Sequence, residues 1–112
     1  MQVQQLTYFV AVALSRHFTR AADETGVSQP TLSKQIRVLE NSLGTPLFIR
    51  RRGAIELTTA GEALLPHAQR ILIEVEAAER SVREVAGLRR GRVRLGATPS
   101  MCDGLLPSVL SQ

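Results

Sequence analysis

The sequence has one cysteine, no long apolar run, and no basic segment followed by an apolar one at its N-terminus. A membrane-spanning helix needs about 18 or more consecutive apolar residues, and a secretory signal needs the missing N-terminal pattern. Cys102 has no second cysteine with which to form an internal disulfide, which fits a reducing compartment. We therefore expect a soluble, cytoplasmic protein with no membrane partner.

Groups that carry catalysis or hold metal ions are also sparse. The two histidines, His17 and His67, lie in different expected elements, and no carboxylate pair is placed to join them. No metal-ligand spacing and no phosphate-cradling glycine loop occurs. We expect no enzyme activity, no metal site and no cofactor, and we interpret both histidines and Cys102 as structural residues.

The remaining composition is typical of a small globular protein with a basic first half. The 112 residues are 44% hydrophobic, enough for about one small domain or a domain with an extension. The net charge is +4, and three cations are consecutive at Arg50, Arg51 and Arg52. A mildly basic balance is compatible with a polyanionic partner.

The most informative stretch, residues 28–40, predicts one helix with two different faces. Ser28 is a suitable N-cap, and Pro30 falls in the first turn, where a missing N–H costs no intrahelical bond. An apolar stripe at helical spacing consists of Leu32, Ile36, Leu39 and Leu43. The opposite face carries Gln29, Ser33, Lys34 and Arg37. These side chains can contact base edges and phosphates in a DNA major groove, or they can form an ordinary solvated helix face.

Two shorter helices are expected before this one. A first helix is predicted across residues 3–15, with Val3, Leu6, Val10 and Ala13 as its stripe and Phe9 and Leu14 beside them. Thr19 can cap a second helix that continues to about Thr25, and Gly26 can end it. Ala22, Gly26 and Leu32 then supply the small contact residue, the turn glycine and the apolar anchor of a helix-turn-helix. A generic helical corner is the alternative.

A two-stranded hairpin is predicted directly after residues 28–44. Residues 47–50 and 55–58 are β-prone and flank the segment Arg51-Arg52-Gly53-Ala54. A ribbon in this place, with cations at its tip, is what a winged helix-turn-helix requires, and the wing would lie along the DNA backbone or enter the minor groove. The alternative is a solvated run of charges.

A long helix is predicted from Thr59, where Thr59 to Glu62 has the form of a capping box. Its a/d seam of spacings four and three consists of Leu64, Ala68, Ile71, Val75, Ala78, Val82 and Val85. Over residues 59–90 such a helix would run about 45 Å, too long to fold back on a small domain. The expected partner is the same helix of a second chain, and the alternative is a stripe that covers a larger domain.

The last residues predict the start of another domain. Residues 89–91 are expected to form a hinge, residues 92–96 a strand, residues 97–100 a loop and residues 105–110 the beginning of a helix. A single strand buries little, so the chain has the pattern of the front of a longer protein. The expected division is a DNA-binding domain at 1–58, a linker and dimerisation helix at 59–90, and the start of a further domain at 91–112.

Taken together, these segments resemble the N-terminal part of LysR-type transcriptional regulators over essentially the whole chain. The matching residues are 18–22 (FTRAA), 27–36 (VSQPTLSKQI), Leu39-Glu40, Leu43-Gly44, Leu47-Phe48, Arg50 and 57–61 (LTTAG). The resemblance implies a mainly α fold: a winged helix-turn-helix of three helices and a two-stranded wing, a long coiled-coil linker helix, and the truncated start of an α/β effector-binding domain. Such proteins bind interrupted palindromic promoter sites, usually as tetramers built from dimers, and bend the DNA.

The resemblance also implies residue roles and partners. Recognition-helix contacts fall on Gln29, Pro30, Ser33, Lys34 and Arg37, supporting phosphate contacts on Thr19, Arg20 and Thr31, and wing contacts on Arg50 and Arg52. The loop with Thr98, Pro99 and Ser100 corresponds to a loop that helps hold a small, commonly anionic inducer, which we expect only a full-length protein to bind. The implied partners are double-stranded DNA and a second copy of the chain, with a tetramer at full length. The alternative function is a coiled-coil interaction module that pairs with full-length relatives.

Overall fold

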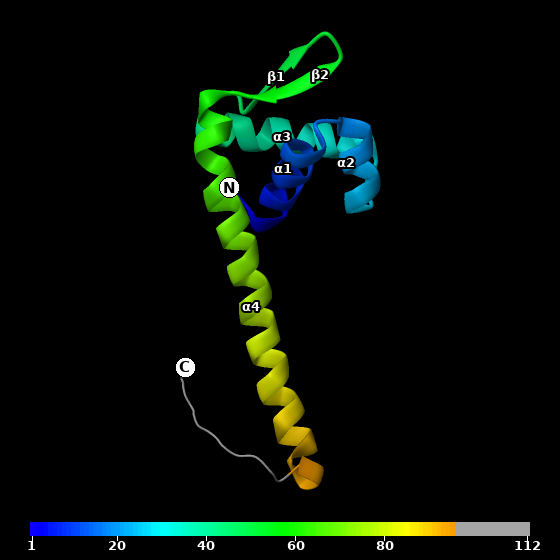
Figure 1. Cartoon of the computed structure of the whole chain (residues 1–112), viewed down its shortest axis with the longest axis vertical. Coiled ribbons are helices and arrows are strands. Elements are labelled where there is room, and N and C mark those ends of the chain that lie inside the picture. The colour runs from blue at the N-terminus through cyan, green and yellow to red at the C-terminus, as the bar shows by residue number, and fades with distance from the viewer. Residues whose placement is uncertain (96–112) are drawn as a thin grey trace. The chain divides into compact units, whose positions relative to one another are not determined.

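The computed structural model describes the backbone of residues 1–95 and the side chains of residues 1–87. It divides into two units, Met1–Val75 and Glu76–Gln112. The elements in chain order are α1 (Val3–Ser15), α2 (Phe18–Thr25), α3 (Gln29–Leu43), β1 (Phe48–Arg51), β2 (Ala54–Leu57) and α4 (Thr59–Leu95) (Figure 1). The expected three helices, two-stranded wing and long helix are thus confirmed. Among the described residues, no helix combines the length and the apolar composition that crossing a membrane needs.

The core of the first unit forms where α1, α2 and α3 meet. Its largest fully buried side chains are Phe9, Val12, Leu32, Leu39 and Leu47. Phe48 and Leu57 of the wing and Leu64, Leu65, Ile71 and Leu72 of α4 pack partly buried against this core. The wing and the first turns of α4 are therefore fixed to the helix-turn-helix by apolar contacts, which supply most of the favourable free energy of folding.

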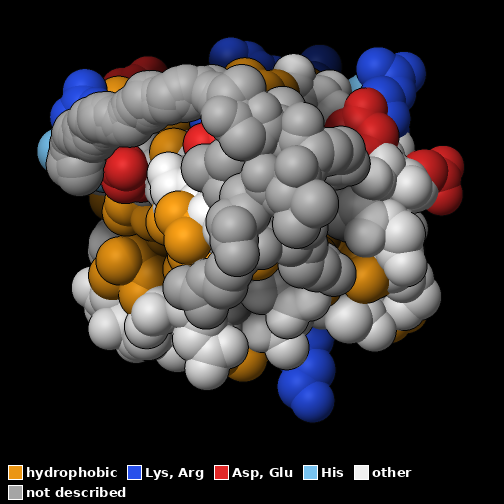
Figure 2. Space-filling view, turned by 90° about the horizontal axis from the view of Figure 1, so that it is seen from below, with side chains coloured by type: hydrophobic (Ala, Val, Ile, Leu, Met, Phe, Trp, Pro, Cys, Tyr) orange, Lys and Arg blue, Asp and Glu red, His pale blue; other side chains and the backbone are white. Residues whose placement is uncertain are grey.

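Some apolar residues of the expected stripes lie at the surface instead. In α1, Val3 is 45% exposed and Leu14 is 64% exposed, and in α3 Leu43 is 41% exposed. All three lie in the first or last turn of a helix. Figure 2 shows hydrophobic side chains, in orange, reaching the surface on the face viewed there. The buried face of α1 also includes Gln5 and Tyr8, which the stripe omitted.

The ends of the helices follow mostly from local chemistry. Gly26 and Gly44 end α2 and α3 with φ of 75° and 77°, in the left-handed region that favours glycine. The Ser28 hydroxyl accepts the Thr31 N–H at 3.3 Å, as expected of an N-cap. The expectation for Thr19 was wrong, because α2 begins at Phe18 with His17 at the N-cap and no side-chain cap bond.

The wing is a tight antiparallel hairpin. Phe48 pairs with Leu57 and Arg51 pairs with Ala54, so the turn consists of Arg52 and Gly53 alone. Their φ values are 44° and 79°, the double positive φ of a primed two-residue turn whose twist suits a hairpin. The Glu40 carboxylate accepts the Leu47 N–H at 2.7 Å, which ties the entry of the wing to α3.

The start of α4 is anchored to the wing by Thr58. Its hydroxyl accepts the Gly61 N–H at 3.0 Å and donates to the Pro46 carbonyl at 2.8 Å. The capping side chain is therefore Thr58, one residue before the Thr59 of the expected capping box. Gly61 lies directly against the Leu47 carbonyl, so the chain is closely packed at this corner.

The backbone of α4 stays helical through Leu95. The expected hinge at residues 89–91 and strand from Arg92 were therefore wrong for the described residues. A strand needs a hydrogen-bonded partner, and within residues 1–95 the only strands pair with each other in the wing. The expected loop with Thr98, Pro99 and Ser100, the helix at 105–110 and Cys102 lie outside the described residues.

Candidate nucleic-acid interface

The outer face of α3 presents polar side chains from a rigid support. Leu32, Ile36 and Leu39 are buried on its inner face. On the outer side, Gln29, Pro30, Thr31, Lys34 and Arg37 are exposed and Ser33 is half-buried. Spacings of four residues place Gln29, Ser33 and Arg37 in one row and Pro30 and Lys34 in the next. The helix therefore offers an amide, hydroxyls and two cations together.

Thr19 and Gln29 are brought together from different helices. Thr19 is the second residue of α2, Gln29 is the first residue of α3, and the Thr19 hydroxyl donates to Gln29 Oε1 at 3.1 Å. Both residues are exposed, and so is the neighbouring Arg20. Three of the sequence-predicted residues thus lie at the junction of α2 and α3.

Arg50 lies against the start of α2. Its guanidinium carbon lies 4.4 Å from the centroid of the Phe18 ring, a cation–π contact. Phe18 meets Phe48 of the wing with ring centroids 6.2 Å apart, and Phe48 meets Phe9 of α1 at 5.3 Å. This aromatic chain sets the position of the wing beside the helix-turn-helix.

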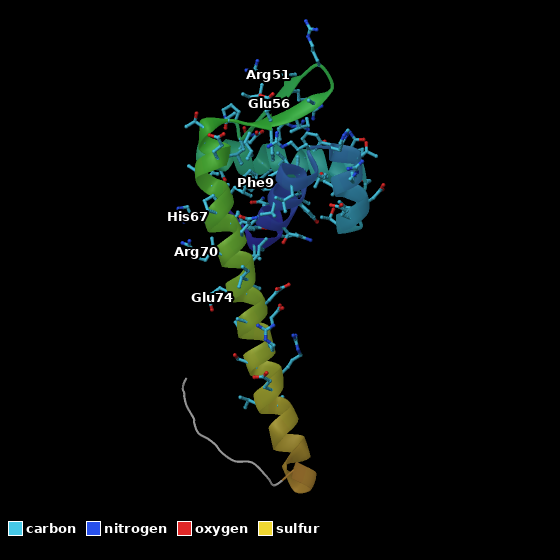
Figure 3. The ribbon with its side chains drawn as sticks, in the orientation of Figure 1. Phe9, Arg51, Glu56, His67, Arg70 and Glu74 are labelled. Atoms are coloured by element: carbon cyan, nitrogen blue, oxygen red, sulfur yellow. The ribbon has the colours of Figure 1, made fainter. Side chains whose placement is uncertain are left out.

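The other two consecutive arginines have different surroundings. Arg51 forms an ion pair with Glu56 across the hairpin, with Nε and Oε1 3.3 Å apart, and both side chains are labelled on the wing in Figure 3. Arg52 occupies the turn and is exposed, and the described residues give it no ion pair. Of the three arginines, Arg52 is therefore the one with neither an ion pair nor a cation–π contact among the described residues.

A hollow of about 220 Å³ lies where the α1–α2 corner, the start of α3 and the wing meet. Thr19, Gln29 and Arg50 line it, together with Arg16 and His17, which no sequence motif had indicated as DNA contacts. Arg16 has a φ of 62° and ends α1, so its exposed side chain leaves from a fixed corner. The sequence feature that could have indicated Arg16 is its position as a cation between two predicted helices. The exposed cations can bind phosphate oxygens, and the amide can bind base edges.

The seam predicted for α4 divides into two groups. Ala68 has no exposed surface, and Leu64 and Ile71 pack against the core of their own chain. The prediction that Ala68 contacts a second chain was therefore wrong, because this part of the seam packs against the core of its own chain. Within the second unit, Val82 is 69% exposed and Val85 is 55% exposed, and Ala78 is exposed as well. Val75 is half-buried.

The first half of α4 also has exposed polar side chains on one side. His67, Arg70 and Glu74, at spacings of three and four, all lie on the side of α4 turned away from Phe9 (Figure 3). Among the described residues, no group of three histidine, cysteine, aspartate or glutamate side chains is placed to hold a metal ion.

Residues 3–62 match the family described as bacterial regulatory helix-turn-helix proteins, lysR family. The HTH-type transcriptional regulator BudR of Klebsiella aerogenes is 46% identical over 111 residues, which cover 99% of this chain and 76% of BudR. The Hca operon transcriptional activator HcaR of Escherichia coli (strain K12) is 44% identical over 110 residues, which cover 98% of this chain and 37% of HcaR. The chain thus spans little more than a third of the length of HcaR.

A solved structure shares the fold. The crystal structure of the CbnR_DBD–DNA complex matches with a TM-score of 0.71 and 41% sequence identity, over 77% of this chain and 99% of that chain. The matched share of this chain is larger than the helix-turn-helix and the wing alone, so the likeness includes part of α4.

Proposed function

The chain belongs to the LysR family of bacterial helix-turn-helix regulators, and we propose that it binds a specific site on double-stranded DNA and regulates transcription. The observation that carries this proposal is the polar outer face of α3, supported from below by Leu32, Ile36 and Leu39 and flanked by the anchored wing. An exposed helix on a rigid base can enter the major groove, where base edges differ between all four base pairs. CbnR, which has the same fold at 41% identity, was solved with DNA.

The side chains divide by the part of DNA that they suit. Gln29, Ser33 and Lys34 have donors and acceptors for base edges, and Arg37 extends the same face with a cation for the backbone. Arg20 of α2 and Thr31 of α3 are exposed beside these residues, and we propose that they contact phosphates. The Ser28 hydroxyl donates to the Thr31 hydroxyl at 3.0 Å, which leaves the Thr31 proton free for a phosphate oxygen.

The two wing arginines take different parts in this proposal. Arg52 leaves the hairpin turn with no ion pair among the described residues, so it can contact the sugar-phosphate backbone or enter the minor groove. Arg50 holds the wing against Phe18 through its cation–π contact and keeps exposed N–H groups that can reach a phosphate. The wing therefore contributes affinity more than base preference.

We propose that the functional unit is a homodimer on an interrupted palindrome. In the second unit the exposed Ala78, Val82 and Val85, at spacings of four and three, form a stripe that water solvates poorly. A second α4 is the partner that such a seam fits. Two identical recognition helices related by a two-fold axis bind half-sites related by the same symmetry.

We propose the domain division that the family resemblance implies. Residues 1–58 bind DNA, residues 59–90 link and dimerise, and residues 91–112 lead into an effector-binding domain, as expected for a chain that covers 37% of HcaR. In a full-length protein a small-molecule inducer would act through that domain, and dimers would pair into tetramers. The relatives BudR and HcaR are transcriptional regulators, and we propose that this chain likewise has no enzymatic activity and acts in the cytoplasm, where bacterial DNA lies.

The proposed function is tested by selection from a pool of random DNA duplexes at several salt concentrations, followed by sequencing of the bound fraction. We expect enrichment of a two-fold symmetric motif and an affinity that falls steeply as salt rises, since each neutralised phosphate contributes a slope of about −0.9. The control variant is Arg70→Ala, which removes a cation that lies outside the proposed DNA contacts. This variant should enrich the same motif as the unmodified chain. Binding without an enriched motif would contradict sequence specificity. Pairing with relatives in the absence of DNA affinity would favour the coiled-coil interaction module instead.

A further inference from the structure

The hydrogen bond between Thr19 and Gln29 determines what each side chain can still do. A threonine hydroxyl has one proton, and phosphate oxygens only accept hydrogen bonds. Because the Thr19 hydroxyl donates to Gln29 Oε1 at 3.1 Å, it has no proton left for a DNA phosphate. Thr19 is therefore unsuited, in this arrangement, to the phosphate contact that the family resemblance implies for it.

The same bond orients the Gln29 amide. A glutamine side chain has three rotatable bonds and loses much rotamer freedom when it is ordered. The oxygen and nitrogen of an amide point in different directions, so holding Oε1 toward Thr19 directs Nε2 away from it. Both N–H groups and one lone pair of Oε1 stay available, which suffices for a bidentate contact with a purine edge.

The backbones on both sides of this bond are held by other contacts. Phe18, the residue before Thr19, is 8% exposed and packs against Phe48. Ser28, the residue before Gln29, caps α3 through the Thr31 N–H. Since the residue before each partner is held by these contacts, the Thr19–Gln29 bond places the amide relative to the outer face of α3.

We propose that Thr19 is a positioning residue for base recognition: it orders the Gln29 amide before DNA binds, and so sharpens the preference at the base position that Gln29 contacts. This role depends on the proposed DNA recognition by α3. It differs from a phosphate contact in its outcome, because ordering one amide changes discrimination at one base position, whereas a phosphate contact changes affinity for all sequences.

The test compares selection from the random duplex pool for the unmodified chain and four variants: Thr19→Val, Thr19→Ser, Gln29→Ala and the double variant Thr19→Val/Gln29→Ala. Valine keeps the shape of threonine without the hydroxyl, and serine keeps the hydroxyl. For Thr19→Val we expect the preference for the favoured base over the others to fall about fivefold at one position. This factor corresponds to the net free energy of an ordinary hydrogen bond. That position should be the one that Gln29→Ala relaxes, and the double variant should behave like Gln29→Ala alone. Thr19→Ser should retain the preference.

Each other result decides against the proposal. A uniform loss of affinity for all sequences with Thr19→Val would indicate that Thr19 contacts the DNA backbone. An unchanged base preference would show that Thr19 has no part in base recognition. Thermal unfolding measured alongside separates both from misfolding, because an exposed hydroxyl contributes little to stability and the midpoint should not move. Failure of the unmodified chain to enrich any motif would refute the proposed function itself, and it is distinguishable because every variant would then fail alike.

Discussion

Replacing Gly61 by alanine is expected to destabilise the first unit, although alanine is the better helix former. Gly61 is the third residue of α4, and a Cβ added there would lie 2.3 Å from the Leu47 carbonyl oxygen and 2.8 Å from Leu57 Cδ2. The leucine side chain can rotate, but the carbonyl belongs to the backbone and accepts the Thr58 N–H at 3.0 Å. Relief of the overlap therefore requires α4 to move away from the wing.

The magnitude follows from opposing contributions. Alanine in place of glycine favours a helix by about 1 kcal/mol. Overpacking a buried site costs about 1–3 kcal/mol, and disturbing the Thr58 cap costs about 1 kcal/mol more. The net loss of unfolding free energy is then about 2 kcal/mol, and it corresponds to a fall in the unfolding midpoint of about 8–16 °C for a domain of this size.

The matched control is the same substitution later in the same helix. A Cβ at Gly87 meets nothing within 4 Å, and Gly87 is exposed. Gly87→Ala should therefore raise helix content and stability by up to about 1 kcal/mol. Unfolding of both variants by urea and by heat is monitored by far-UV circular dichroism. All samples have the same protein concentration, because dimerisation makes stability depend on concentration. If Gly61→Ala proved as stable as the unmodified chain, the close packing of α4 against the Leu47 carbonyl would be refuted.

Three further variants test the proposed DNA contacts and the dimer. Arg52→Asn should weaken binding to all sequences alike and reduce the slope of log affinity against log salt concentration by about 1. The hairpin should stay intact, because asparagine tolerates the φ of 44°. A slope as unchanged as that of the control variant Arg70→Ala would contradict a contact with the DNA backbone. Gln29→Ala should cost about 1–3 kcal/mol on the preferred site and relax one base position, and equal losses on specific and random duplexes would exclude base recognition. Val82→Glu combined with Val85→Glu should abolish self-association in sedimentation experiments, and a persistent dimer would place the interface elsewhere.

Local chemistry in the sequence was sufficient to predict the elements. Ser28, Gly26 and Gly44 act within a few residues of their own positions, so the cap of α3 and the ends of α2 and α3 could be found without knowing the tertiary structure. The stripe of Leu32, Ile36 and Leu39 likewise follows from helical spacing alone. The hairpin was predicted in the right place, but its strands lie at Phe48–Arg51 and Ala54–Leu57 because the pairing register decides which residues form the turn.

The tertiary structure decided which surfaces and side chains are available. Spacing put Ala68 in a dimer seam, but the crossing of α4 over the core leaves it with no exposed surface. Three consecutive arginines look alike in the sequence, yet Arg50 lies over Phe18, Arg51 pairs with Glu56, and Arg52 alone has neither kind of partner among the described residues.

Thr19 was expected to cap a helix, but its hydroxyl bonds Gln29, ten residues away. The sequence by itself therefore determined the helices, the wing and the family. Contacts between residues far apart in the chain depend on how the helices cross, and no local pattern encodes that geometry.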